Sequence, residues 1–107
     1  MPDKNGNGKE TKKNDFSEVE EDLKDKEQDL IEMGKFYFLN NKYDEAIGEL
    51  KKAANLNPKN PDIYYNLGII YETKNMQQEA REMFTKTLEL NEKHQLAQEH
   101  LDKLIGT

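Results

Sequence analysis

The chain has 107 residues, of which 36% are charged and 34% hydrophobic, so its length suits one small domain with a limited core. Its 22 acidic and 16 basic residues give a net charge of -6, which disfavours nucleic acid and anionic membrane surfaces as partners. The absence of cysteine excludes disulfides, thiolate catalysis and cysteine zinc sites.

Membrane insertion is not expected either. Every apolar run is far shorter than the roughly 18 residues of a spanning helix, and the first residues lack the apolar stretch of a secretory signal. We therefore expect a cytoplasmic protein. A signal or anchor lying outside this sequence would change that expectation.

Residues 1–15 consist almost wholly of Lys, Asn, Gly, Asp, Glu and Thr without apolar periodicity, which predicts a disordered tail. Within it, the twelve residues from Asp3 to Asn14 begin like a calcium-binding loop, with Gly8 at the sixth position. The twelfth position is Asn14, where such a loop needs a bidentate glutamate, and only two residues precede Asp3. We expect no calcium site there, and no metal or cofactor elsewhere.

A domain is expected over residues 16–107, and its first segment, residues 16–26, is mostly charged. Ser17 followed by Glu20 has the form of a capping box, so we expect a helix to start at Ser17. Over residues 18–29, only Val19 and Leu23 offer an apolar stripe. The segment is either a separate N-terminal helix or an extension of the next helix, and the sequence leaves both open.

From residue 27 the sequence repeats itself with a shift of 34 residues, which defines two units, 27–60 and 61–94. The identical pairs include Gly34 with Gly68, Tyr37 with Tyr71, Asn41 with Asn75, Glu45 with Glu79, Ala46 with Ala80, Lys52 with Lys86, Leu56 with Leu90 and Asn57 with Asn91. An internal repeat of this length is typical of stacked supersecondary units.

Each unit has the apolar spacing of two helices. The positions that carry this spacing are Leu30, Met33, Tyr37, Ala46, Leu50, Ala53 and Leu56 in the first unit, and Tyr64, Leu67, Tyr71, Ala80, Phe84 and Leu88 in the second. Asn41 and Asn75 suit the turns between the helices, because asparagine tolerates a left-handed backbone. Pro61 suits the first turn of the third helix.

The glycines of the two units are expected where the paired helices touch. A glycine inside a helix costs about 1 kcal/mol relative to alanine unless close packing compensates. We therefore expect Gly34 and Gly68 at the helix contacts, with Ala46 and Ala80 facing them.

These residues resemble the tetratricopeptide repeat (TPR) family. The first unit matches its motif at Leu30, Met33, Gly34, Tyr37, Ala46, Leu50, Ala53 and Pro58, and the second at Tyr64, Leu67, Gly68, Tyr71, Ala80 and Phe84. The second departs at Thr87, where a small apolar residue is usual, and at Glu92, where the proline falls. Residues 95–105 look like the capping helix of such an array. The resemblance implies an all-α helical-hairpin solenoid of about five to six helices.

The resemblance also implies a non-enzymatic scaffold, an adaptor, co-chaperone or assembly factor, that binds a partner's peptide or helix in a concave groove. By motif position the groove residues are Ile31, Lys35, Phe38, Tyr65, Asn66, Ile69, Glu72, Leu96 and Lys103. Two other readings stay open for the apolar ones. They pack under residues 16–26, with Val19 and Leu23 folded back into the groove, or they are buried in a homodimer or a longer array.

One TPR subgroup binds acidic chaperone tails through a clamp of lysines, asparagines and an arginine. Here Asn66 alone matches, because Ile31, Lys35, Leu96 and His100 stand at the other clamp positions, so this ligand is disfavoured. Catalysis is not expected either, since the single serine is assigned to a helix cap. His94 and His100 are about 240° apart around a helix and are expected to be solvated.

Overall fold

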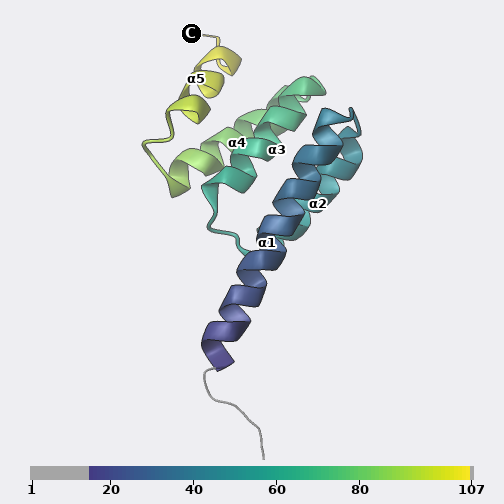
Figure 1. Ribbon diagram of the computed structural model, residues 1–107. Helices are drawn as coiled ribbons and strands as arrows, with labels where there is room; N and C mark the ends of the chain where they lie inside the picture. Colours follow the sequence, from purple (N-terminus) through teal and green to yellow (C-terminus); the bar gives the residue numbers. More distant parts are fainter. Residues whose placement is uncertain (1–14, 107) are drawn as a thin grey trace, which may run out of the picture.

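The computed structural model describes residues 15–106, with side chains from residue 19 onward. This range holds five helices and no strand: α1 (Asp15–Leu39), α2 (Tyr43–Leu56), α3 (Pro61–Thr73), α4 (Gln77–Leu90) and α5 (Gln95–Leu104). Helices α1 and α2 form one antiparallel pair, α3 and α4 a second pair beside it, and α5 packs on α4 (Figure 1). The predicted all-α solenoid is confirmed. The calcium-like stretch from Asp3 to Asn14 lies outside the described residues.

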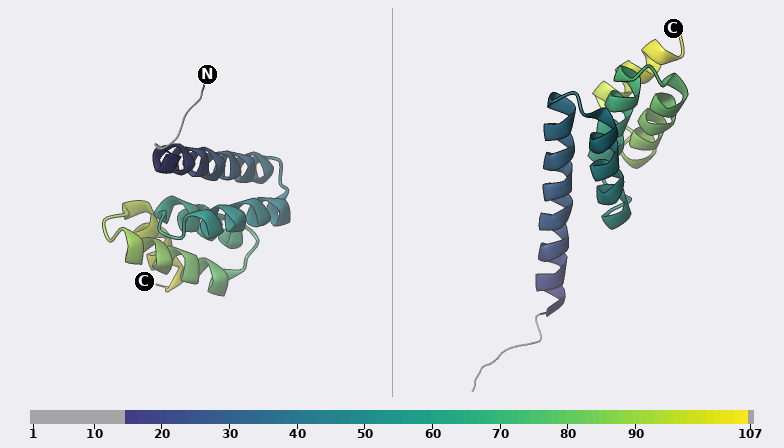
Figure 2. Two further views of the ribbon diagram at one scale, coloured as in Figure 1. Left: turned by 90° about the horizontal axis from the view of Figure 1, so that it is seen from below. Right: turned by 90° about the vertical axis from the view of Figure 1, so that its right-hand side faces the viewer.

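Helix α1 is one continuous helix of 25 residues, so residues 16–26 extend the first helix of the repeat. No proline or glycine interrupts the sequence between residue 15 and Gly34, which allows this continuity. The helix begins at Asp15, two residues before the predicted start at Ser17, whose side chain is outside the described set. Its first half projects past the end of α2 (Figure 2).

The extension does not fold back over the rest of the domain. Val19 is 53% exposed and Leu23 46% exposed. The alternative in which they fill the groove is therefore wrong, because about half of each side chain stays exposed on α1, which is a straight helix (Figure 2).

The turns within the repeats form as predicted. Asn41 and Asn75 both have φ of 63°, the left-handed conformation that ends a helix. At the start of α3, the Asn60 side chain accepts a hydrogen bond from the Asp62 backbone N–H at 2.9 Å, and Pro61 follows the cap. The helix boundaries are therefore set by short-range chemistry that repeats along the chain.

The two glycines lie at the closest approach of the paired helices. A Cβ added at Gly34 would lie 2.8 Å from Leu50 Cγ, and one added at Gly68 would lie 2.6 Å from Phe84 Cε1. The side chains nearest to the glycines are thus Leu50 and Phe84, and the predicted alanines, Ala46 and Ala80, are fully buried. The larger side chains fill the space that the missing Cβ atoms leave.

The apolar positions predicted for the second unit are buried or half-buried, whereas two of those in the first unit, Met33 and Leu56, are exposed. Leu67 is 2% exposed, whereas Met33, which aligns with it, is 45% exposed. Helix α3 packs against α2 of the preceding unit, and no described helix covers α1 in the corresponding way. The same motif position is therefore buried in one unit and open in the other.

A buried carboxylate joins the two units. Glu27 is 9% exposed, and its carboxylate accepts hydrogen bonds from Asn57 Nδ2 at 3.1 and 3.2 Å and from Asn60 Nδ2 at 2.6 Å. Both asparagines belong to the connection between α2 and α3. The network therefore fixes α1 against that connection.

Candidate functional site

Two hollows lie between α1 and α3. The larger, of about 350 Å³, is lined by Gln28, Ile31, Lys35, Asn60, Asp62, Tyr65 and Asn66. The smaller, of about 40 Å³, is lined by Gly34, Lys35, Phe38, Leu50, Asn66, Ile69 and Ile70. Lys35 and Asn66 border both, so the two hollows form one groove, which we call the α1/α3 groove.

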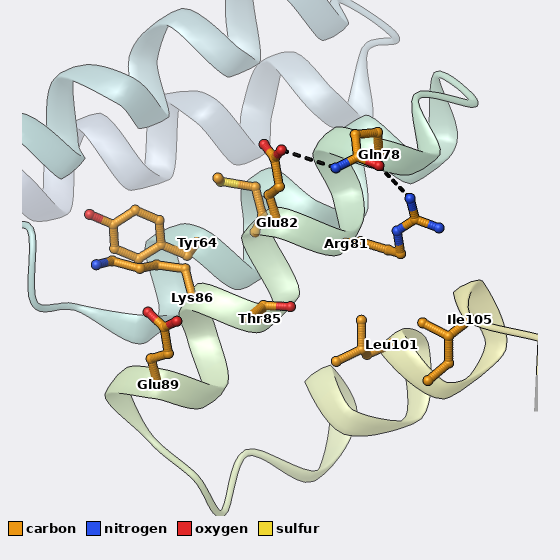
Figure 3. A pocket seen from close by; sticks show the side chains of 10 residues that line it. Tyr64, Gln78, Arg81, Glu82, Thr85, Lys86, Glu89, Leu101 and Ile105 are labelled. Atoms are coloured by element: carbon orange, nitrogen blue, oxygen red, sulfur yellow. Dashed lines mark hydrogen bonds between the residues drawn. The ribbon is translucent and has the colours of Figure 1, made fainter.

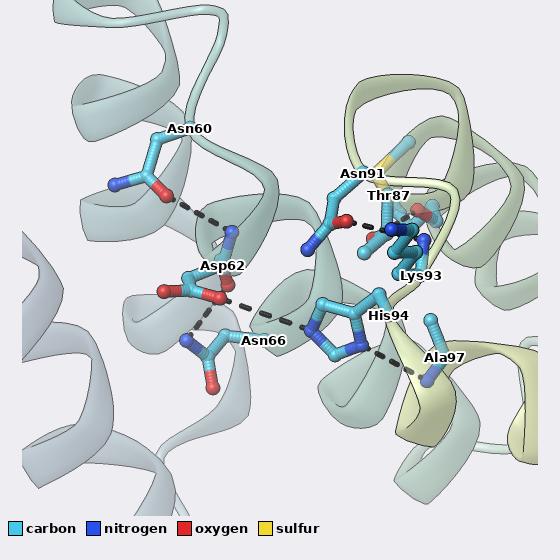
Figure 4. Close-up of polar contacts among 9 residues, drawn as sticks. Asn60, Asp62, Asn66, Thr87, Asn91, Lys93, His94 and Ala97 are labelled. Carbon is cyan, nitrogen blue, oxygen red and sulfur yellow. Dashed lines mark hydrogen bonds and ion pairs between the residues drawn. The ribbon is translucent and has the colours of Figure 1, made fainter.

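The first helix of each pair positions the groove. Asp62, Tyr65, Asn66 and Ile69 of α3 line the groove and follow the i, i+3, i+4, i+7 pattern, so they lie on one side of that helix. The Asn66 side chain donates a hydrogen bond to the Asp62 backbone carbonyl at 2.9 Å, which restrains its amide at the edge of the groove (Figure 4).

Most of the predicted site residues meet in this groove. Those that line it are Ile31, Lys35, Phe38, Tyr65, Asn66 and Ile69. Ile31, however, is only 5% exposed and belongs to the core, which gives it a structural reason to be apolar. Phe38, Tyr65 and Ile69 are half-buried, and Lys35 is exposed.

The remaining predicted residues lie outside the two hollows. Glu72 is near the end of α3, where it contacts α5 through His100. Leu96, in the first turn of α5, is 52% exposed, and Lys103 is exposed in its last turn. These three residues do not line the described groove.

An aromatic cluster that the sequence did not predict joins α3, α4 and α5. The Tyr65 ring centroid lies 4.8 Å from that of His94 and 5.9 Å from that of Phe84. His100 stacks on Phe84 with centroids 5.2 Å apart, and its Nδ1 lies 2.8 Å from Glu72 Oε1. The prediction of two solvated histidines is therefore wrong, because both are half-buried and pack on rings.

His94 also begins the last helix. Its Nδ1 accepts a hydrogen bond from the Ala97 backbone N–H at 3.2 Å, so it is the N-cap of α5. Its Nε2 lies 3.8 Å from Asp62 Oδ1, at the edge of the α1/α3 groove (Figure 4). The 34-residue shift places His94 on Asn60, the N-cap of α3, and that alignment was the signal for this role.

Burial raises the pKa of the Tyr65 phenol above its ordinary value of 10.0, and the negative charges of Glu72 and Glu99 raise it further. The phenol therefore stays protonated at neutral pH, where it can donate a hydrogen bond at the groove. The carboxylates of Glu72 and Glu99 therefore lie near enough to act electrostatically on the Tyr65 phenol.

The described residues show neither a metal site nor a membrane helix. Within residues 19–106, no group of three His, Cys, Asp or Glu side chains is placed to hold a metal ion. Among the helices that the structure describes, none has the length and apolar character needed to cross a membrane. The groove combines apolar rings and aliphatic groups with an amide and an ammonium group.

A wider hollow of about 640 Å³ lies on another side of the domain, between α4 and α5 (Figure 3). Leu101 and Ile105 point into it from α5, and Lys86 and Tyr64 line its far end. The repeat alignment did not predict this hollow. The sequence feature that could have indicated it is the pair of apolar residues at the end of α5, of which Ile105 is 54% exposed.

The paired helices, the left-handed asparagine turns and the glycine contacts define a helical-hairpin repeat protein. Sequence models of this class match the chain twice, a TPR repeat at residues 34–75 and a tetratricopeptide repeat at residues 61–94. The chain belongs to the tetratricopeptide repeat family, a protein-interaction fold.

Solved structures agree with this assignment. The chain is similar to the first TPR domain of Spaghetti (RPAP3) bound to the HSP90 peptide SRMEEVD, with 28% identity and a TM-score of 0.71, over 75% of this chain and 65% of that chain. It is also similar in fold to MamA, with 24% identity and a TM-score of 0.70, over 83% of this chain and 52% of that chain. The chain thus spans about half to two thirds of the length of these proteins. No curated protein matched the sequence.

Proposed function

We propose that this chain is a non-enzymatic adaptor, co-chaperone or assembly factor that binds a peptide or helix of a partner protein in the α1/α3 groove. The observation that carries the proposal is the composition of that groove. Half-buried Phe38, Tyr65 and Ile69 supply apolar anchors, while Lys35 and Asn66 supply a charge and an amide beside them. Apolar anchors with a polar border are typical of peptide-binding surfaces.

The ligand is expected to differ from an acidic chaperone tail. The similar Spaghetti domain was solved with such a peptide. In this chain only Asn66 keeps a residue of the chaperone clamp, and the ring of His100, which stands at another clamp position, packs on Phe84 beside Glu72. Two carboxylates near Tyr65 would also repel acidic residues. We therefore expect SRMEEVD to bind more weakly than about 1 mM.

A second candidate is a structural module that dimerises or continues an array. The apolar side chains of Val19 and Leu23 on the projecting part of α1 favour it, because they are exposed. Sedimentation over a range of protein concentrations separates the two candidates. A monomer at all concentrations would contradict self-association.

The first proposal is tested by partner capture from a lysate of the source cells. Changing Tyr65 and Ile69 to alanine should abolish capture without loss of helix content. Because Tyr65 also packs on Phe84, a second variant, Lys35→Glu, changes the groove at an exposed residue. The matched control is Ile105→Ser, which lies in the other hollow. Capture that survives both groove variants would show that the groove is not the binding site.

A further inference from the structure

One side of α1 presents large apolar side chains to solvent. Met33 is 45% exposed and Phe36 58% exposed. They are three residues apart on one helix, so they lie next to each other on its surface. Phe36 is not among the residues that line the α1/α3 groove. This surface is therefore distinct from the proposed peptide site.

The second repeat shows what such a surface packs against. The shift of 34 residues places Met33 on Leu67 and Phe36 on Ile70. Leu67 and Ile70 are each 2% exposed, and the helix that carries them packs on α2 of the preceding unit. In the second unit the same two positions are therefore buried on a helix that packs against α2. Helix α2 has 14 residues.

The surroundings of this surface are mostly acidic, with one cation, Lys26, seven residues before Met33. Asp29 lies four residues before Met33, and Glu32 lies four residues before Phe36, so both carboxylates border the apolar pair. One and two turns further back, Asp25 and Asp22 continue the same side of the helix. All four acidic residues are exposed. We call these residues, with Met33 and Phe36, the outer face of α1.

The acidic residues of the outer face of α1 help to decide which protein segment could cover it. A second copy that paired its own outer face antiparallel to this one would bring these carboxylates together, which costs free energy. Residues 1–14 contain only Met1 and Pro2 as apolar side chains, too few to cover both Met33 and Phe36. A helix with apolar residues on one stripe and Lys or Arg beside them would satisfy both the apolar pair and its acidic border.

We propose that the outer face of α1 is a docking site for an amphipathic helix of a partner protein, about 14 residues long, with basic side chains flanking its apolar stripe. This helix packs on α1 as α2 packs on α3. The site acts independently of the α1/α3 groove, so the domain holds two protein segments at once.

The test uses a labelled 14-residue peptide of leucine and lysine, with leucines at helical spacing, and a counterpart in which every lysine is glutamate. Fluorescence anisotropy at about physiological salt should show binding of the lysine peptide and little binding of the glutamate peptide. The double variant Met33→Ser with Phe36→Ser should weaken binding at least about tenfold, since the two side chains lose their burial. The double variant Asp29→Lys with Glu32→Lys should reverse the preference between the peptides.

Two controls keep the result specific. Ile105→Ser removes a side chain of similar exposure, 54%, from another surface and should leave binding unchanged. The groove change of Tyr65 and Ile69 to alanine should also leave it unchanged, so this proposal and the groove proposal fail separately. Equal binding of both peptides, or binding that Met33→Ser with Phe36→Ser does not weaken, would overturn the proposal. So would a dimer of the natural chain that this same double variant dissociates.

Discussion

At the scale of single residues, two glycines set the distance between the paired helices. Gly34 and Gly68 face Leu50 and Phe84, both fully buried, so the side chains opposite have little room to move. Gly48 offers a matched comparison, because it lies inside α2 and a Cβ there would meet nothing within 4 Å.

Alanine at Gly34 or Gly68 should therefore change the free energy of unfolding in the opposite direction from alanine at Gly48. Gly68→Ala and Gly34→Ala should each lower the free energy of unfolding by about 1–3 kcal/mol, because the added methyl group overpacks the helix contact. Gly48→Ala should raise it by about 0.5–1 kcal/mol, since only the helix propensity changes. Urea unfolding followed by circular dichroism measures all three. Stabilisation by all three substitutions would contradict the close approach at Gly34 and Gly68.

At the scale of the elements, the junction between the two units depends on one carboxylate. The Glu27 carboxylate pairs with the Asn57 and Asn60 amides, which lie 30 and 33 residues further along the chain, and it is nearly buried. Asn60 also caps α3. The network therefore couples the position of α1 to the start of α3, and so to the width of the groove between them.

Glu27→Ala should lower the free energy of unfolding by about 1–3 kcal/mol, because it leaves two amide groups without their acceptor. Glu32→Ala is the control on the same helix, since its carboxylate is exposed and bonds only within α1 to Gln28. Its effect should stay within about 0.5 kcal/mol. Urea midpoints of the two variants give the comparison. Equal midpoints would show that the Glu27 network contributes nothing to stability.

The elements also show which features a sequence can reveal. The helix pairs, the asparagine turns and the start of α3 at Pro61 are determined by residues close together in the sequence. Because the pattern occurs twice, these features could be predicted. The continuity of α1 rests on the absence of a break over residues 15–33, which the sequence alone did not distinguish from a second helix. In the sequence, Glu27 looks like an ordinary exposed acidic residue. Its partners Asn57 and Asn60 become its neighbours only after α2 folds back along α1.

The α1/α3 groove was predicted only in part, because local patterns fix some of its residues and packing between distant helices fixes others. Lys35, Phe38, Tyr65 and Ile69 come together because motif position fixes the side of the helix that they occupy. Ile31, by contrast, is buried by its neighbours. The ring cluster of His94 and His100 depends on the angle at which α5 crosses α4, and no local pattern encodes that angle.

At the scale of the whole molecule, the helices build separate surfaces on one small scaffold. The α1/α3 groove, the hollow between α4 and α5 and the outer face of α1 are formed by different sets of residues. A scaffold of stacked hairpins can expose several such surfaces, because each helix contacts only its neighbours. Of these surfaces, the α1/α3 groove is the one that we propose holds the partner.

Site-specific photo-crosslinking shows whether the partner lies in this groove. A photo-crosslinking residue is placed at position 35, in the groove, or at position 51, an exposed position of α2 outside it. Irradiation in a lysate of the source cells should join one partner protein to the chain from position 35 and not from position 51. The adduct should disappear when Tyr65 and Ile69 are alanine. Equal crosslinking from both positions, or an adduct from position 51 alone, would contradict the groove as the site of partner binding.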